Sequence, residues 1–281
     1  MDQKIISLFD RYTHGGMNRR EFLDKLKLLA GSAAGATALL PLLENNYAKA
    51  DILPEGDARI ATSSITFEGG SGYLVQPKSE GKFGSIVVIH ENRGLNPHIK
   101  DIARRVAAEG FVALAPDYLN GLGGTPTYED KARDMIGTLK PDGILATSRA
   151  ALDAAKVQSK SNGKGGVIGF CWGGSAVNAL AVADQTLDAG VAYYGMQPPA
   201  ADVAKIKAPL LLHYAGLDER TNAGIPAFDA ALKAAGTIHE IYVYDGVNHA
   251  FNNDTNAARY DKTAADLAWG RSIAFLKKYL S

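Results

Sequence analysis

The chain has 281 residues, of which 46% are hydrophobic and 21% charged, and its 30 acidic residues balance its 30 basic ones. This length and apolar share suit one large globular domain and exclude a disordered or fibrous protein. The balanced charge offers no overall field for a polyanion, so we expect no nucleic-acid partner. The single cysteine, Cys171, excludes an internal disulfide and a thiolate-rich zinc site.

The N-terminal segment carries the features of an export signal. The pair Arg19-Arg20 precedes a small-residue apolar run from Leu26 to Leu43, which leads to Ala48-Lys49-Ala50. This order resembles a twin-arginine signal, which predicts cleavage after Ala50 and a periplasmic protein. The alternative is a cytoplasmic protein with an uncleaved helical extension, which the long segment before the arginines favours.

Glycine and proline interrupt the apolar run at Gly31, Gly35 and Pro41, so we expect no stable membrane span. We therefore divide the chain into an N-terminal signal-like or helical extension, residues 1–50, and a catalytic domain, residues 51–281.

From residue 58 onward, short apolar strand patterns alternate with helical ones, which is typical of a parallel sheet covered on both faces. The run 86–89 is continuously apolar, as in a strand buried on both sides. We expect a hairpin within 59–77 and further strands at 86–89, 111–115, 166–170, 189–194, 209–214 and 239–244. We expect helices at 99–109, 128–136, 143–156, from about 173 onward, and at 260–279.

A sharp strand-to-helix turn is predicted at Gly169-Phe170-Cys171-Trp172-Gly173. The pattern matches the G-x-S-x-G nucleophile elbow with cysteine in place of serine. Such a turn strains the backbone of the nucleophile, and its neighbours two residues away must lack side chains. The helix N-terminus would lower the pKa of the thiol, and the Trp172 N–H would face a developing oxyanion. The sequence thus predicts Cys171 as a nucleophile.

An acid and a base follow the elbow in the order that hydrolases of this kind require. Asp218 comes just after the predicted strand 209–214, with Glu219 as the fallback acid, and His249 comes after the last predicted strand. A carboxylate and an imidazole in these loops predict a Cys-His-Asp triad. His14 and His239 lie in no motif.

With these residues in place, the chain resembles the dienelactone hydrolase (carboxymethylenebutenolidase) family over most of its length after the N-terminal extension. The resemblance implies an α/β-hydrolase fold, a mostly parallel central sheet with helices on both faces, and a small-molecule ester or lactone substrate. It implies no metal and no organic cofactor.

The family also has a glutamate at the end of an early strand, and Glu91 of His90-Glu91-Asn92-Arg93-Gly94 stands in that place. The resemblance implies that Glu91 contacts the resting thiol and is displaced by substrate, and that the Asn92 N–H is the second oxyanion donor. The alternative for Glu91 is a solvated carboxylate or one paired with Arg93.

The family's carboxylate clamp is incomplete here, because Ala250 and Asn253 occupy two of its positions. Arg93, Arg133 or Lys131 are the candidate substitutes, and Tyr118 and Tyr194 are expected to line an aromatic pocket with Trp172. As substrate-binding residues we predict Arg93, Tyr118 and Tyr194.

Three alternatives stay open at this point. One is a general carboxylesterase or thioesterase for neutral substrates, and another is a catalytically silent ligand-binding homologue. A redox-sensing thiol is the third, although it needs no Asp–His pair. The sequence makes no prediction of oligomeric state.

Overall fold

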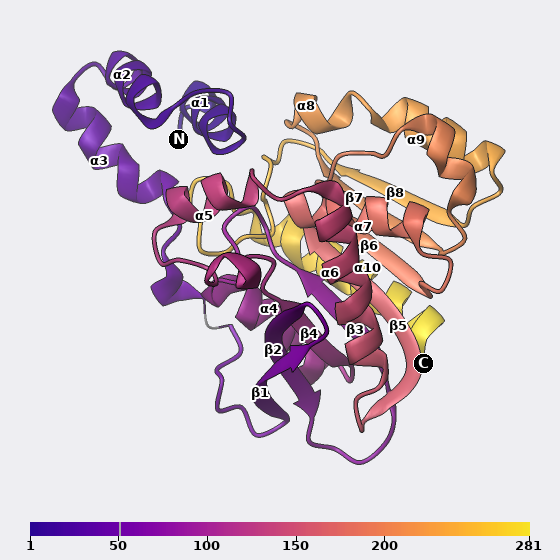
Figure 1. The fold of residues 1–281 in the computed structure, drawn as a ribbon. Helices are drawn as coiled ribbons and strands as arrows, with labels where there is room; N and C mark the ends of the chain where they lie inside the picture. Colours follow the sequence, from indigo (N-terminus) through magenta and orange to yellow (C-terminus); the bar gives the residue numbers. More distant parts are fainter. Residues whose placement is uncertain (51) are drawn as a thin grey trace.

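The computed structural model describes residues 1–50 and 52–281, and a mostly parallel sheet runs through the larger part of them (Figure 1). In this described part the sheet has eight strands in the order β1-β2-β4-β3-β5-β6-β7-β8. β1 pairs antiparallel with β2 and β2 with β4, and the remaining neighbours are parallel. The strands are β1 (Ile60–Phe67), β2 (Gly70–Pro77), β3 (Phe83–Ile89), β4 (Val112–Pro116), β5 (Ser161–Phe170), β6 (Ala189–Tyr193), β7 (Leu210–Ala215) and β8 (His239–Tyr244).

Helices cover both faces of this sheet, as the alternating pattern predicts. α4 and α10 pack on one face, and α6, α7 and α9 pack on the other (Figure 1). The helices of this part are α4 (Pro97–Ala108), α5 (Glu129–Ile136), α6 (Pro141–Lys156), α7 (Trp172–Ala183), α8 (Glu219–Asn222), α9 (Ile225–Ala234) and α10 (Lys262–Leu280). Short 3₁₀ turns lie at Asn120–Leu122 and Ala200–Lys205.

β3 shows why the core has two halves. Ile86 and Val88 point into the hydrophobic cluster beneath α4 and α10, whereas Val87 and Ile89 point into the cluster beneath α6 and α7. All four side chains are fully buried. The prediction of a strand buried on both faces is therefore confirmed, and so is the α/β-hydrolase architecture.

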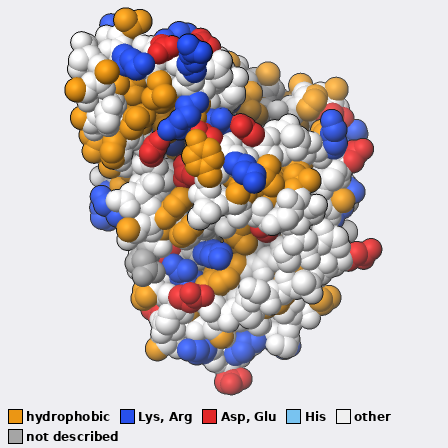
Figure 2. Space-filling view, turned by 60° about the vertical axis from the view of Figure 1, so that its left-hand side comes forward, with side chains coloured by type: hydrophobic (Ala, Val, Ile, Leu, Met, Phe, Trp, Pro, Cys, Tyr) orange, Lys and Arg blue, Asp and Glu red, His pale blue; other side chains and the backbone are white. Residues whose placement is uncertain are grey.

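The N-terminal segment forms a separate helical layer beside the sheet. It consists of α1 (Gln3–Thr13), α2 (Arg19–Leu29), α3 (Ala33–Leu43) and a 3₁₀ turn at Tyr47–Lys49. These helices pack on one another through a small apolar cluster of their own, in which Phe22, Leu26 and Leu43 are fully buried. The outer face of the molecule in Figure 2, whose upper part belongs to these helices, carries both apolar and charged side chains.

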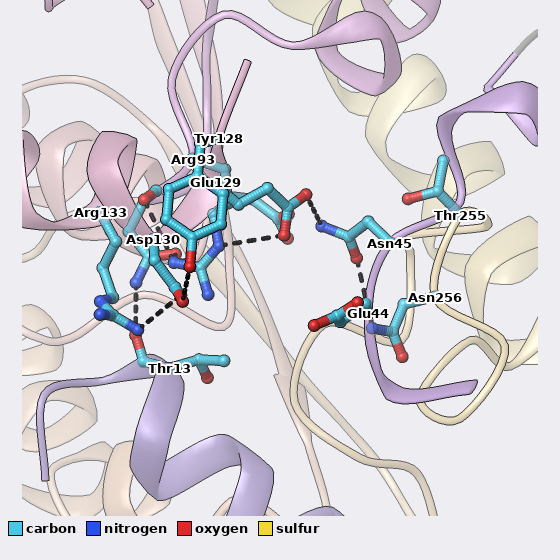
Figure 3. Close-up of polar contacts among 12 residues, drawn as sticks. Thr13, Glu44, Asn45, Arg93, Tyr128, Glu129, Asp130, Arg133, Thr255 and Asn256 are labelled. Atoms are coloured by element: carbon cyan, nitrogen blue, oxygen red, sulfur yellow. Dashed lines mark hydrogen bonds and ion pairs between the residues drawn. The ribbon is translucent and has the colours of Figure 1, made fainter. Parts of the chain in front are cut away.

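Polar contacts fasten this helical layer to α5 and to the loop before α10 (Figure 3). The Tyr12 hydroxyl and the Arg19 guanidinium both donate to Oδ2 of Asp130, at 2.5 and 2.8 Å. Asn45 donates to Oε1 of Glu129 at 2.9 Å and accepts from Asn256 at 3.2 Å. Arg19, the first arginine of the Arg19-Arg20 pair, is thus engaged in an ion pair with Asp130 on α5.

Among the described residues, no single helix is both long enough and apolar enough to cross a membrane. The pair Arg19–Leu29 and Ala33–Lys49 meets the length and composition criteria only when taken together, and it is bent by 115°.

α7 approaches the carbonyl end of β3 so closely that there is no room for a side chain at Gly173, its second residue. A Cβ atom at Gly173 would lie 2.6 Å from the carbonyl oxygen of His90 and would also collide with that of Ile89. Both obstructing atoms belong to backbone, which cannot rotate away.

Gly173→Ala is therefore expected to lower the free energy of unfolding by about 1–3 kcal/mol, because strand and helix must separate to admit the methyl group. Gly143→Ala is the matched control, since a Cβ at Gly143 in α6 would meet nothing within 4 Å. There we expect no loss, or a gain of about 0.5 kcal/mol. Urea unfolding of both variants measures the difference, and equal stabilities would contradict this account of the packing.

Candidate active site

Cys171 occupies the turn between β5 and α7 with its backbone in the left-handed region, at φ 55° and ψ −112°. Few non-glycine residues adopt such a conformation, which costs of order 1–3 kcal/mol. A Cβ at Gly169 would collide with the backbone of Gly173, so both flanking glycines are required by close approach. The predicted elbow is present, and the residue that it presents, Cys171, is 8% exposed.

His249 and Asp218 meet in loops that follow β8 and β7. Nδ1 of His249 donates to Oδ2 of Asp218 at 2.6 Å, and both side chains are buried. The other carboxylate oxygen of Asp218 accepts from the backbone N–H of Thr221 at 3.2 Å, which fixes the carboxylate. This geometry protonates Nδ1 and leaves Nε2 of His249 as a proton acceptor, and Nε2 has no hydrogen-bond partner among the described residues.

The sulfur of Cys171 lies between two imidazoles. Nε2 of His14, at the end of α1, is 3.3 Å from Sγ. The ligand-type atoms of His14, Cys171 and His249 all lie within 4.8 Å of one another, and the two rings meet edge to face.

The charges around the sulfur favour the thiolate. Burial by itself raises the pKa of the Cys171 thiol, but the positive charges of His249 and His14, together with the hydrogen bond from His14, lower it to about 6. Burial lowers the pKa of His249, yet the Cys171 thiolate, Asp10 and Asp218 raise it to about 10. Burial likewise raises the pKa of Asp218, but the hydrogen bond and charge of His249 lower it to about 2. These shifts favour a thiolate on Cys171 and an imidazolium on His249.

Glu91 does not make the expected contact with the thiol. Its Oε2 accepts from Nδ2 of Asn253 at 2.7 Å, and its Oε1 has no hydrogen-bond partner among the described residues. The contact with Sγ is made by His14 instead. Glu91 does not pair with Arg93 either, because Nε of Arg93 lies 3.4 Å from Oε2 of Glu129.

The two predicted oxyanion donors lie beside the nucleophile. Trp172 is the first residue of α7, where the backbone N–H has no acceptor within the helix. Asn92 follows β3 in the facing loop, and its Nδ2 donates to the carbonyl oxygen of Thr13 at 2.8 Å. That hydrogen bond holds the loop after β3 against the end of α1.

A cleft of about 560 Å³ opens onto Sγ. The predicted residues that line it are Cys171, Trp172, Asn92 and Tyr194. It is also lined by Thr13, His14, Gly15, Arg133, Asp134, Ile136, Gly137, Thr138, Ser175, Met196 and Arg220.

The three residues predicted to bind substrate lie in different settings. Tyr194 lines the cleft and packs its ring on His249 at 4.9 Å between centroids. The backbone of Tyr194 has a φ of 40°, which lies outside the strand region. β6 therefore ends at Tyr193, one residue before the predicted end of that strand. Tyr118 lies behind Trp172 with its hydroxyl bonded to Ser148, and Arg93 is buried beside Glu129, so neither lines the main cleft.

His14 is the site residue that the sequence did not indicate. It comes from the N-terminal extension, outside the alternating pattern that orders the other site residues, and no local motif marks it. An Asp10–His14 pair at i, i+4 near the end of a helix was the one available signal, and such pairs are common on solvated helices.

The sequence also matches known proteins along most of its length. Residues 71–280 match the family model "Dienelactone hydrolase family", and residues 1–30 match the model "YqhI-like". "Putative hydrolase fragment YghX" of Escherichia coli K12 is 46% identical over 38% of this chain and 97% of its own. A "Putative carboxymethylenebutenolidase" of Salmonella typhi is 29% identical over 89% of this chain and 96% of its own.

The fold agrees with these matches. The crystal structure of a "Putative Dienelactone Hydrolase" from Klebsiella pneumoniae superposes with a TM-score of 0.72 at 26% identity, covering 78% of this chain and 99% of that one. The match over residues 71–280 includes β2 to β8 and with them the elbow, Asp218 and His249. The chain is a hydrolase that belongs to the dienelactone hydrolase family.

Proposed function

We propose that this enzyme hydrolyses an ester or lactone bond with Cys171 as nucleophile, His249 as base and Asp218 as the acid that orients the base. The observation that carries the proposal is the 2.6 Å hydrogen bond between His249 Nδ1 and Asp218, which aims Nε2 at the strained turn holding Sγ. The family match and the Salmonella relative described as a "Putative carboxymethylenebutenolidase" support an ester or lactone bond as the bond that is cleaved.

In the first step, the Cys171 thiolate, whose proton has already passed to Nε2 of His249, attacks the carbonyl carbon. A C–S bond forms, and the carbonyl electron pair moves to oxygen, where the N–H groups of Trp172 and Asn92 stabilise the anion. The C–O bond to the leaving oxygen then breaks, and that oxygen takes the proton from His249. A thioester on Cys171 results; in a lactone the leaving oxygen stays attached to the acyl group.

In the second step, water attacks the thioester carbon while its proton passes to Nε2 of His249. The C–S bond breaks, and the acid leaves with the thiolate restored. Asp218 keeps His249 in the required tautomer throughout both steps.

The cleft wall fits a small, partly apolar substrate with one anionic group. Ile136, Trp172 and Met196 supply apolar surface. Arg133 is already neutralised by Asp130 and Asp134, each at 3.0 Å. Arg220 is exposed and forms no ion pair with any residue in the described part of the chain, so we propose it as the residue that binds a substrate carboxylate.

Cys171→Ala is expected to remove hydrolysis of both a chromogenic acetate ester and cis-dienelactone, because no other cysteine exists to replace it. Both substrates are assayed at neutral pH with wild type alongside. A general esterase would hydrolyse only the acetate ester, and a catalytically silent homologue would hydrolyse neither. Turnover that persists in the folded variant would refute the mechanism.

Asp218→Asn is expected to lower kcat by about a hundredfold or more, because the amide can present an N–H to His249 and favour the wrong tautomer. Folding should be retained, since asparagine also accepts from the Thr221 N–H at the start of α8. Glu219→Gln, one residue along and exposed, is the control and should keep wild-type kcat. Equal losses in the two variants would argue against Asp218 as the acid.

Arg220→Gln is expected to raise KM for a lactone that carries a carboxylate by roughly tenfold, the effect of losing one charge-assisted hydrogen bond. KM for the neutral acetate ester should stay unchanged in the same variant. A rise for both substrates, or for neither, would remove Arg220 from the substrate site.

A further inference from the structure

The thiol of Cys171 faces two acid–imidazole pairs rather than one. Asp218 holds His249 from the hydrolase body. On the other side, Asp10 holds Nδ1 of His14 through its backbone oxygen at 2.8 Å and its carboxylate at 3.3 Å. In both pairs Nδ1 is occupied by an acceptor, so that Nε2 faces the sulfur.

The second pair is built into the structure. The carboxylate of Asp10 also lies 3.6 Å from Nη1 of Arg259, whose guanidinium packs over the ring of Phe9. The side chain of His14 is 16% exposed and lies at the inner wall of the cleft. Arg259, from the loop before α10, therefore helps to fix Asp10 and, through it, His14.

The surrounding contacts show that this position of His14 depends on the docked extension. Gln3 donates to Asn248, the neighbour of His249, at 2.6 Å, and Asn92 donates to the carbonyl of Thr13 at 2.8 Å. Tyr12 and Arg19 both bind Asp130 on α5. Both ends of α1 are thus fixed, its start through Gln3 and the end that leads into His14 through Tyr12 and Thr13.

We propose that the N-terminal extension is part of the active site and supplies, through Asp10 and His14, a second acid–imidazole pair that holds Cys171 as a thiolate. His14 is a catalytic residue in this account because it touches the reacting sulfur, and Asp10 is a positioning residue. The thiol proton then has two acceptors, Nε2 of His14 and Nε2 of His249. The identity of the bond that the thiolate attacks rests on the proposed function. The pairing of Cys171 with His14 does not depend on it.

The charged and titratable groups that face the sulfur and its two imidazoles come from every element around them. They are Asp10 and His14 on α1, Glu91 and Arg93 after β3, Tyr194 after β6, Asp218 after β7, His249 and Arg259 after β8, with Arg133 and Arg220 at the cleft wall. Of these, the two imidazoles contribute most to lowering the pKa of the thiol. The pKa of His14 is itself raised, since the Cys171 thiolate and Asp10 together outweigh its burial.

The test is the pH dependence of Cys171 alkylation by iodoacetamide in full-length protein, where no second cysteine reacts. Wild type should show a midpoint near pH 6. In His14→Gln the midpoint should rise by about one unit or more, because a neighbouring positive charge has been removed. One unit lowers the thiolate fraction at pH 6 roughly fivefold. An unchanged midpoint would overturn the proposal.

Asp10→Asn should move the midpoint in the same direction by less, because the backbone oxygen still holds Nδ1 of His14. His239→Gln is the matched control. Nδ1 of His239 also binds a backbone oxygen and its Nε2 binds Asp229, but His239 lies at the amino end of β8, away from Cys171. Its midpoint should equal that of wild type. Thiolate absorbance in the ultraviolet gives the same midpoints without a reagent.

Treatment with a chelator shows whether the low midpoint of Cys171 alkylation is caused by the imidazole of His14 or by a bound metal ion. Wild type treated with EDTA should keep its low midpoint, and a rise to that of His14→Gln would mean that a metal ion, not His14 itself, holds the thiolate. If alkylation behaves as expected but neither ester nor lactone is hydrolysed, the proposed function fails while the role of His14 stands.

The proposal also requires that the working enzyme keeps residues 1–50, because cleavage after Ala50 would remove Asp10 and His14 together. Intact-mass measurement on protein made in a bacterium with twin-arginine export should give the full 281-residue chain in the active fraction. Activity found only in a chain that begins at residue 51 would overturn the proposal.

Discussion

The backbone of Cys171, held at φ 55°, is the constraint on which the rest of the site depends. Nothing local favours that conformation in a cysteine; it persists because β5, α7 and β3 approach too closely for any other path of the chain. The turn lifts Sγ out of the sheet to the place where the loops after β3, β7 and β8 converge. Since parallel strands bring their carboxyl ends to one edge, residues far apart in sequence reach the same atom.

A buried thiol is ordinarily a poor nucleophile, because burial disfavours the charged form. Here burial is the largest single influence on the pKa of Cys171, and it raises that pKa. The two histidines together outweigh burial and lower the pKa below its usual value. Their own positive charges are in turn held by Asp218 and Asp10. In the proposed mechanism the site is a series of alternating charges, acid, imidazole, thiolate, imidazole, acid, in which each group stabilises the charged form of the next.

The N-terminal layer completes that series of charges without sharing the core of the sheet. Its apolar residues pack mainly on one another, while its attachment uses hydrogen bonds and ion pairs to α5 and to the loops around Asn248 and Asn256. Asn92, whose backbone N–H is the proposed second oxyanion donor, also donates from its side chain to Thr13 of α1, so the attachment and the proposed chemistry are linked.

The amino-acid sequence by itself determined the sheet, its covering helices, the elbow and the order of Asp218 and His249. Those features are local: apolar periodicity sets strands and helices, and the glycines at 169 and 173 leave room for a tight turn between a strand and a helix. The position of His14, the partner that Glu91 chooses and the exclusion of Tyr118 from the cleft were decided by tertiary structure. The positions of Glu91 and His14 depend on contacts between segments more than a hundred residues apart, Glu91 with Asn253 and His14 with Cys171. The position of Tyr118 depends on Trp172 and Ser148, which belong to other elements of the fold. A polar side chain in an exposed-looking helix gives no sign of which distant group it will meet, because that is fixed by how whole layers pack.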